Sequence, residues 1–538
     1  MLDKGEAMSL KEYSGFHIFW GDMHTNVHGK DIFFPPLTLD RLKMVMDAAE
    51  EHLDFFAIAY YPFEWYSING LIIESCGHRE RFESEWNLVR EAIKKANKPG
   101  KFVTFLGYEW HGDRRRYGDH NVYYLDDGPL DYSKTIEELY ANIRKNNGIA
   151  IPHHTGYQVG ERGKDWNYFD EELSPVAEIY SSHGSSEGVS APRFLDSNIN
   201  MGPGTSGGTI LDGLNRGYKF GIIASGDNHR DFPGVWGNGL VAVFAKELTK
   251  EAIWDAIKKR RAYGVTGDRI QLYFSINGHI MGEAFNSRNK ADINVEVTGS
   301  DAIDTIQIIK NGKVIYTYFH YEKKFEPKGE IRVKIRLQCG WGPTSFYGFK
   351  NLRVKELSGS FKVSDGEIIS VEPCYTYFGQ KVKFVSPNEY NFKFKIQPRT
   401  PLDPLTTQHH RTNLQGAIFE IKAHPESSIT IQVNAKTVEF SLKEAIERER
   451  LIALIDEAKL AIQDNFGLRP EEIENPDIFW HNAWKIRVSK AVPFERYHAK
   501  VNYIDNENQE GENYYYVRVI QSNGQMAWSS PIWIRNLM

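Results

Sequence analysis

The chain has 538 residues, of which 41% are hydrophobic and 25% are charged, and its formal net charge at pH 7 is −6. This length exceeds what one hydrophobic core supports and therefore predicts more than one domain. The slightly acidic balance excludes a global attraction to nucleic acid or to a membrane surface, so we expect a small-molecule partner and no nucleic acid.

The three cysteines, Cys76, Cys339 and Cys374, lie far apart and form no CxxC pair. This spacing fits neither a disulfide framework nor a thiolate metal site, and it favours a reducing compartment. The first twenty residues contain no apolar leader-like stretch, and no run approaches the roughly 18 apolar residues that cross a bilayer. We therefore expect a cytoplasmic protein without a membrane partner, and the oligomeric state stays open.

Residues 16–270 alternate short apolar runs with amphipathic stretches, the pattern of βα units around a parallel sheet or barrel. The expected helices cover 39–52, 85–96, 136–146 and 250–261. The apolar runs cover 16–20, 53–59, 102–106, 148–152, 176–180, 210–215 and 220–224. We predict that residues 1–270 form one α/β domain.

From about residue 271 apolar and polar residues alternate, and Asn-Gly pairs begin at positions 277 and 311. This texture is typical of antiparallel β-structure with tight hairpins, so we predict an all-β, β-sandwich-like domain over 271–538. One stretch near 442–464 has helical spacing and predicts a helical insertion. The run 514–520 predicts a strand that completes the sheet.

Histidines and carboxylates recur directly after the strand-like runs of the first domain, which places them at one edge of a sheet or barrel, where sites are built. The set is Asp22, His24, Glu109, His111, His120, His153, His154, Glu178, His183, Asp227 and His229. Each alone is compatible with an ordinary loop or core residue. Together they predict a site for Zn, Mn or Fe ions, which polarise a phosphoryl or carbonyl oxygen and lower the pKa of bound water.

Several of these motifs resemble the polymerase-and-histidinol-phosphatase (PHP) superfamily of metallohydrolases, in particular a branch with an appended β domain. The resemblance runs through Gly21-Asp22-Met23-His24, Gly107-Tyr108-Glu109-Trp110, Gly118-Asp119-His120, Pro152-His153-His154, Glu178 to His183 and Gly226-Asp227-Asn228-His229, and it reaches the ending at 515–519 and 527–533. It implies a distorted (β/α)7 barrel with two or three metal ions at its mouth.

Carried over position by position, the resemblance implies that His24 and Asp227 bind one metal. Glu109 would bridge this metal to a second one, held by His120 and His154. In the same way, His229 would belong to a third metal, and the supporting or alternative ligands would be His153, Glu178 and His183.

Two positions depart from the family pattern. Asn26 stands where the second imidazole of the opening His-x-His is expected, and Tyr61 stands where the next strand would end in histidine. An amide oxygen and a phenol of pKa near 10 bind divalent cations more weakly than imidazole does. The number of ions, one to three, therefore stays open.

The predicted function is a metal-dependent hydrolase, most simply a phosphoesterase with an anionic substrate. Arg114 and Arg116 would clamp the anion, with a solvated basic turn as the alternative, and Asp227 or His229 would handle the proton. A catalytically degenerate barrel that serves as a binding or scaffold protein is the second hypothesis. The third is a carbohydrate-active protein whose β domain binds sugars.

Overall fold

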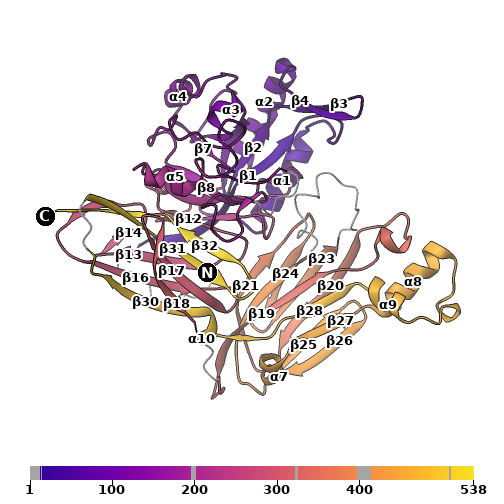
Figure 1. Ribbon diagram of the computed structural model, residues 1–538. Coiled ribbons are helices and arrows are strands. Elements are labelled where there is room, and N and C mark those ends of the chain that lie inside the picture. Colours follow the sequence, from indigo (N-terminus) through magenta and orange to yellow (C-terminus); the bar gives the residue numbers. More distant parts are fainter. Residues whose placement is uncertain are drawn as a thin grey trace.

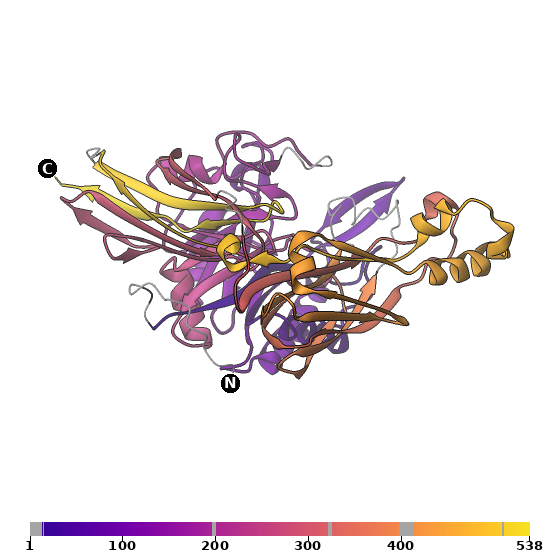
Figure 2. The ribbon, with the colours of Figure 1, turned by 90° about the horizontal axis from the view of Figure 1, so that it is seen from below.

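Strands dominate the fold of this chain. The structure is a computed structural model that describes Tyr13 and residues 15–195, 201–320, 325–396, 414–507 and 511–537. Among the described residues, strands make up 43% and helices 19%, so there are too few helices for a helix to follow every strand. Figure 1 shows the N-terminal half at the top, with the C-terminal strands in two bodies below it, and Figure 2 shows the same arrangement from below.

The N-terminal half contains helices α1 (Leu39–Glu50), α2 (Arg79–Ala96), α3 (Arg114–Tyr117), α4 (Ile136–Lys145), α5 (Ile210–Asn215) and α6 (Lys250–Lys258). Its strands are β1 (His17–His28), β2 (Phe55–Tyr61), β3 (Glu64–Ile68), β4 (Leu71–Ser75), β5 (Val103–Trp110), β6 (His120–Tyr124), β7 (Gly148–Pro152), β8 (Val176–Ser181), β9 (Gly184–Ser185), β10 (Gly221–Ala224), β11 (Leu240–Ala245) and β12 (Ala262–Val265).

The strands that follow are β13 (Gln271–Ile276), β14 (His279–Ile280), β15 (Ala284–Ser287), β16 (Ala291–Thr298), β17 (Ile303–Lys310), β18 (Lys313–Phe319), β19 (Ile331–Gly340), β20 (Lys355–Val363), β21 (Gly366–Cys374), β22 (Lys381–Ser386), β23 (Glu389–Ile396), β24 (Gln415–Ala423), β25 (Ser428–Val433) and β26 (Lys436–Ser441). The chain ends with α7 (Leu442–Glu447), β27 (Arg450–Ala453), α8 (Ile455–Phe466), α9 (Asp477–Asn482), β28 (Lys485–Val488), β29 (Val492–Pro493), α10 (Phe494–Tyr497), β30 (His498–Asp505), β31 (Gly511–Gln521), β32 (Met526–Ser529) and β33 (Ile532–Asn536).

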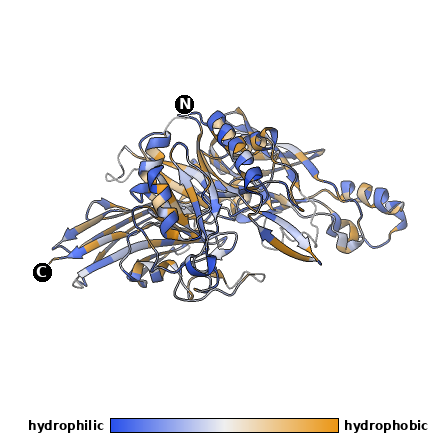
Figure 3. Ribbon diagram, turned by 90° about the horizontal axis from the view of Figure 1, so that it is seen from above, coloured by the Kyte–Doolittle hydropathy of each residue, from blue (hydrophilic) through white to orange (hydrophobic). Residues whose placement is uncertain are grey.

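The four predicted helices of the N-terminal half are confirmed as α1, α2, α4 and α6. Threonines cap three of them: the side chains of Thr38, Thr135 and Thr249 accept a hydrogen bond from the backbone N–H three residues later. Such a cap satisfies one of the unpaired donors of the first turn. In Figure 3 the helices carry hydrophilic and hydrophobic residues side by side, as expected where one face lies on a sheet.

The predicted (β/α)7 barrel is wrong. The largest sheet has the strand order β15-β33-β31-β32-β12-β11-β1-β2-β5-β6-β7, with β17 and β18 attached through β31. In its N-terminal part only β1, β2 and β5 run parallel, while β6, β7, β11 and β12 pair antiparallel. Between β5 and β6 lies only the four-residue helix α3, and a parallel pair needs a longer crossover.

The predicted β-sandwich-like domain is also corrected, because the C-terminal strands are divided among several sheets. β15, β17, β18, β31, β32 and β33 join the large N-terminal sheet, where β32 pairs with β12. The others form the sheets β14-β13-β16-β30, β21-β24-β19-β28-β27 with β29, and β22-β23-β20-β25-β26. The division near residue 270 remains a prediction.

Both Asn-Gly pairs form the predicted tight turns. Asn277 and Gly278 connect β13 to β14 with φ values of 51° and 83°. Asn311 and Gly312 connect β17 to β18 with φ values of 49° and 76°. Two successive positive φ angles characterise the type I′ turn, which Asn-Gly favours.

The helix predicted near 442–464 is two helices with a strand between them. Ser441 starts α7 with a capping box to Glu444, and Arg448 leaves the helix with extended backbone angles. The next residues form β27, in which Ile452 pairs with Ile486 of β28. The helical spacing in this stretch therefore belongs to two short helices. The residues between them form a strand because they pair with β28.

A loop of the N-terminal half enters a hydrophobic core of the C-terminal half. Phe232 and Val235 follow β10 and are buried in the core between the β19 and β20 sheets.

None of the helices in the described ranges combines the length and apolar composition that a membrane crossing needs.

Candidate metal centre

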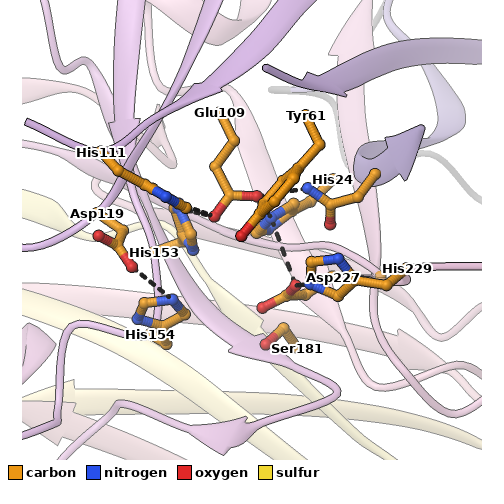
Figure 4. A network of polar contacts seen from close by, with 12 residues as sticks. His24, Tyr61, Glu109, His111, Asp119, His153, His154, Ser181, Asp227 and His229 are labelled. Carbon is orange, nitrogen blue, oxygen red and sulfur yellow. Dashed lines mark hydrogen bonds and ion pairs between the residues drawn. The ribbon is translucent and has the colours of Figure 1, made fainter. Parts of the chain in front are cut away.

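The predicted residues converge because the strands that carry them are neighbours (Figure 4). His24 lies within β1, Glu109 near the end of β5, and Glu178 within β8. His153 and His154 directly follow β7, and Asp227 and His229 lie in the loop after β10. The described residues contain three groups whose possible ligand atoms lie within 4.8 Å of one another.

The first group, called the central cluster here, consists of His24, His153, Glu178 and Asp227, all buried. His24 Nδ1 lies 2.9 Å from Glu178 Oε2, and His24 Nε2 lies 3.5 Å from Asp227 Oδ1. The rings of His24 and His153 meet edge to face with centroids 4.4 Å apart. Two imidazoles and two carboxylates form a ligand set that suits Zn, Mn or Fe.

Several polar atoms of the central cluster make no hydrogen bond within the described part of the chain. These atoms are His24 Nε2, both ring nitrogens of His153 and Glu178 Oε1. Buried polar atoms nearly always have a partner, since an unsatisfied one costs about 1–3 kcal/mol. The donor set therefore fits a metal ion.

Two further groups flank the central cluster. His154, His183 and Asp227 form one of them, with His183 Nε2 3.0 Å from Asp227 Oδ2. Glu109, His111 and Asp119 form the other, with His111 Nε2 2.6 Å from Glu109 Oε1. Asp227 belongs to the first two groups, and His154 Nε2 lies 3.4 Å from Asp119 Oδ2 of the third, so the three groups are parts of one continuous site.

Burial and neighbouring charges shift the pKa values of the central-cluster residues in different directions. Burial opposes protonation of His24, but the carboxylates of Asp227 and Glu178 outweigh it and hold the pKa of His24 well above its usual value. Burial lowers the pKa of His153 to about 3, which leaves this imidazole neutral and able to donate a lone pair. Burial also raises the pKa of Glu178 to about 7.

Two site residues have left-handed backbone conformations. His154 has φ 33° and Asp227 has φ 45°. Non-glycine residues adopt such angles at a cost, and they persist where the surroundings impose them, often at functional sites.

Asp22 and His120, both predicted as ligands, lie outside the three groups. The Asp22 carboxylate accepts four hydrogen bonds, from the backbone N–H of His24, Gly226 and Gly234 and from the Thr25 hydroxyl. Asp22 therefore ties β1 to the loop after β10. His120 Nε2 lies 3.2 Å from the buried Lys164 Nζ, and His120 Nδ1 makes no hydrogen bond within the described residues.

The structure places the predicted anion clamp at the edge of the site. Arg114 donates to both oxygens of Asp119, at 2.7 and 2.9 Å, and Arg162 donates to the same carboxylate at 3.0 Å. Arg116 lies farther out, where its guanidinium group stacks on Tyr168 and donates to the Tyr168 hydroxyl.

The two positions that depart from the family pattern contact carboxylates of the site. The Asn26 amide donates to Glu109 Oε2, and the Tyr61 hydroxyl donates to Glu74 Oε2. Glu74 and Asp119 were not among the predicted site residues, although Asp119 precedes His120 in the motif Gly118-Asp119-His120. Glu74 lies on the β3–β4 hairpin, and no motif or spacing in that part of the sequence predicted that it would reach the site.

Parts of this chain are similar to one known family and to several curated relatives. A family model described as "Protein of unknown function (DUF3604)" matches residues 41–147 and 233–296. An uncharacterised protein of Chlamydia pneumoniae is 29% identical over 258 residues, which are 44% of this chain and 41% of that protein. One of Chlamydia muridarum is 25% identical over 261 residues, 44% of this chain and 41% of that protein.

A third relative, from Chlamydia trachomatis, is 24% identical over 300 residues, 51% of this chain and 47% of that protein. The chain thus spans less than half the length of these relatives. Among solved structures, a two-domain protein of Bacteroides vulgatus, described as containing a predicted PHP-like metal-dependent phosphoesterase, aligns with a TM-score of 0.33 and 12% identity over 82% of this chain and 98% of that one. The described residues of this chain contain buried His, Asp and Glu groups that could hold a metal ion.

Proposed function

We propose that this chain is a metal-dependent hydrolase that acts on phosphoesters. The observation that carries the proposal is the central cluster, in which His24, His153, Glu178 and Asp227 present buried ligand atoms toward one point. A divalent ion held there would polarise a phosphoryl oxygen and assist the attack of water.

Positive charge beside the cluster supports an anionic substrate. Arg114 and Arg162 both bind Asp119, whose Oδ2 lies 3.4 Å from His154 Nε2. Arg114 also donates to Glu74 Oε1, so these two guanidinium groups are matched by two carboxylates, and their support for an anionic substrate rests on their position beside the site. Guanidinium groups bind phosphate through paired hydrogen bonds. The resemblance of the strand-end motifs to the PHP superfamily agrees with this substrate class.

His229 is suited to move the proton. Its side chain is 15% exposed, and its Nε2 lies 3.4 Å from Asp227 Oδ1. Its Nδ1 pairs with His28 Nε2 at 2.9 Å, which orients the ring. A partly exposed imidazole can exchange a proton with solvent and deliver it to the site.

The proposal is tested by metal analysis of the purified chain, reconstitution with Mn²⁺ or Zn²⁺, and a panel of phosphomonoesters, phosphodiesters and amides. We expect bound metal, hydrolysis of at least one phosphoester class, and a loss of about 10- to 100-fold in metal affinity for His153→Ala. The matched control is His498→Ala, which removes a half-buried imidazole outside the site.

Failure to bind metal after reconstitution would overturn the proposal. Metal binding without hydrolysis of any phosphoester would also overturn it and would favour the scaffold hypothesis. Amide hydrolysis alone would keep the hydrolase and refute the substrate class.

A further inference from the structure

A second candidate site lies in the C-terminal half, apart from the metal centre. A cavity of about 990 Å³ opens between the segment 341–355 and helices α8 and α9. These helices project at the right of Figures 1 and 2, away from the strands that carry the metal centre. The cavity shares no lining residue with the three ligand groups. Its volume is at the upper end of the range for small-molecule sites.

Aromatic rings form much of the cavity wall, including Trp341, Trp480, Trp484 and Phe349. Trp480 is 42% exposed, so part of its indole is open to the cavity or to solvent. Within the described ranges no indole N–H of these three tryptophans donates a hydrogen bond to the protein. An exposed indole offers a flat surface and a free donor to a ligand.

The backbone at the cavity wall has an unusual conformation. Trp341 has φ 59° and Gly342 has φ 116°. A Cβ atom added to Gly342 would lie 2.7 Å from Trp484 Cδ1, so the chain here must pass directly against the indole. A bulky residue in the left-handed region is strained and persists only where its surroundings hold it. The backbone at Trp341 and Gly342 is therefore held in a defined conformation against Trp484 in the wall.

The cavity is positively charged although the whole chain is acidic. Lys350, Arg353, Lys355 and Lys485 line it together with a single acid, Asp464. Two of the lysines are held by the protein itself. Lys355 pairs with Glu457 and lies over the Trp484 ring, while Lys485 lies over the Trp480 ring and donates to the Ala483 carbonyl at 2.8 Å.

The other two cations of the cavity, Lys350 and Arg353, have no such partner in the part of the chain that the structure describes. Neither the Lys350 ammonium group nor the Arg353 guanidinium group forms an ion pair with a residue in the described ranges. Both side chains are exposed beside the aromatic wall. Unpaired cations next to a flat aromatic surface attract ligands that combine negative charge with a ring.

We propose that this cavity binds a small anionic molecule that carries a ring. The ring stacks on Trp480, and the anionic group is bound by Lys350 and Arg353. A mononucleotide and an acidic disaccharide share this chemistry, because each joins a stackable ring to a phosphate or carboxylate. The proposal does not depend on the metal centre and stands if the proposed hydrolase activity fails.

Calorimetric titration of the full chain with four probes tests the proposal: adenosine monophosphate, a uronic-acid disaccharide, a neutral disaccharide and inorganic phosphate. We expect at least one of the two charged ring probes to bind, and to bind at least about tenfold more tightly than the neutral sugar or phosphate. Trp480→Ala should weaken this binding about 5- to 100-fold. Arg353→Ala should weaken it too and should reduce its dependence on salt.

The matched controls are Phe384→Ala and Lys383→Ala on β22, which remove an exposed aromatic ring and an exposed cation away from the cavity. They should change affinity less than twofold, and circular dichroism should show all variants folded. If neither charged ring probe binds at millimolar concentration, the proposal is wrong. Equal binding of the neutral sugar, or equal losses in the control variants, would overturn it as well.

Discussion

At the residue scale, Asn26 shows how a position that departs from a family pattern can still serve the site. The amide is fully buried, and it donates to Glu109 Oε2 while His111 bonds Glu109 Oε1. Both carboxylate oxygens are therefore oriented by neighbouring side chains. Burial favours the protonated form of Glu109, but His111 and its other partners outweigh burial and hold the Glu109 pKa well below its usual value. Asn26 thus positions a carboxylate of the candidate site through its amide nitrogen, while its Oδ1 makes no hydrogen bond within the described residues.

We predict that Asn26→Ala lowers the affinity for Mn²⁺ about tenfold, because Glu109 loses the donor that fixes one of its oxygens. Titration of the metal-free protein measures this effect. Asn513→Ala removes an equally buried amide far from the site and should leave the affinity unchanged. Unaltered Mn²⁺ affinity in Asn26→Ala would show that Glu109 needs no such support.

At the element scale, the Glu74 carboxylate links the β3–β4 hairpin to the candidate metal centre, beside the Trp65 ring, which packs against His28 and His229. Most of this hairpin is exposed, including Leu71 at 67%. Glu74 in β4 accepts hydrogen bonds from Tyr61, Trp65, His111 and Arg114. Burial favours the protonated form of Glu74, but His111 and Arg114 outweigh it and keep its pKa far below the usual value. The ionised Glu74 carboxylate is therefore one of the contacts that hold the hairpin against the site, together with the Trp65 ring.

Glu74→Ala should release the hairpin, because four donors lose their shared acceptor. We expect amide hydrogen exchange in residues 64–75 to rise at least about tenfold, which corresponds to about 1.4 kcal/mol of lost local stability. Hydrogen exchange with mass spectrometry measures the change. Glu80→Ala, at an exposed position in the first turn of α2, is the control and should leave the exchange as it is. Unchanged exchange in Glu74→Ala would show that backbone pairing alone holds the hairpin.

At the scale of the whole molecule, the C-terminal half anchors the loop that carries Asp227 and His229. Phe232 packs with its ring centroid 5.2 Å from that of Phe378, and the Trp236 backbone N–H donates to the Tyr375 carbonyl at 2.8 Å. The Trp236 indole N–H also donates to Asp268, which binds Arg336 of β19. A metal-centre loop is thus held by side chains from a distant part of the chain.

This arrangement predicts that Phe378→Ala weakens metal binding about tenfold although Phe378 touches no ligand. The space left beside Phe232 allows the loop after β10 to shift, and small displacements of ligands lower affinity. The control is Tyr390→Ala, which removes a partly buried ring packed on the same core beside Phe384 and Phe419. Equal loss of metal affinity in both variants would mean that general destabilisation, and no specific anchoring, is responsible.

The local sequence determined the turns and helices that depend only on residues close together in the chain. The Asn-Gly pairs produced two-residue turns because these residues tolerate positive φ, and α1, α4 and α6 appeared where apolar periodicity follows a threonine cap. The strand-end positions predicted that His24, His153, Glu178 and Asp227 lie at one edge of the fold, but not that these four form one group, because the resemblance gave His153 and Glu178 only as supporting or alternative ligands. The direction and the partners of a strand depend on contacts between distant segments of the chain. Only the tertiary structure therefore showed mixed sheets where a barrel was predicted, and the pairing of β12 with β32. The same long-range contacts brought Glu74 to His111 and joined Asp22 of β1 to the loop after β10.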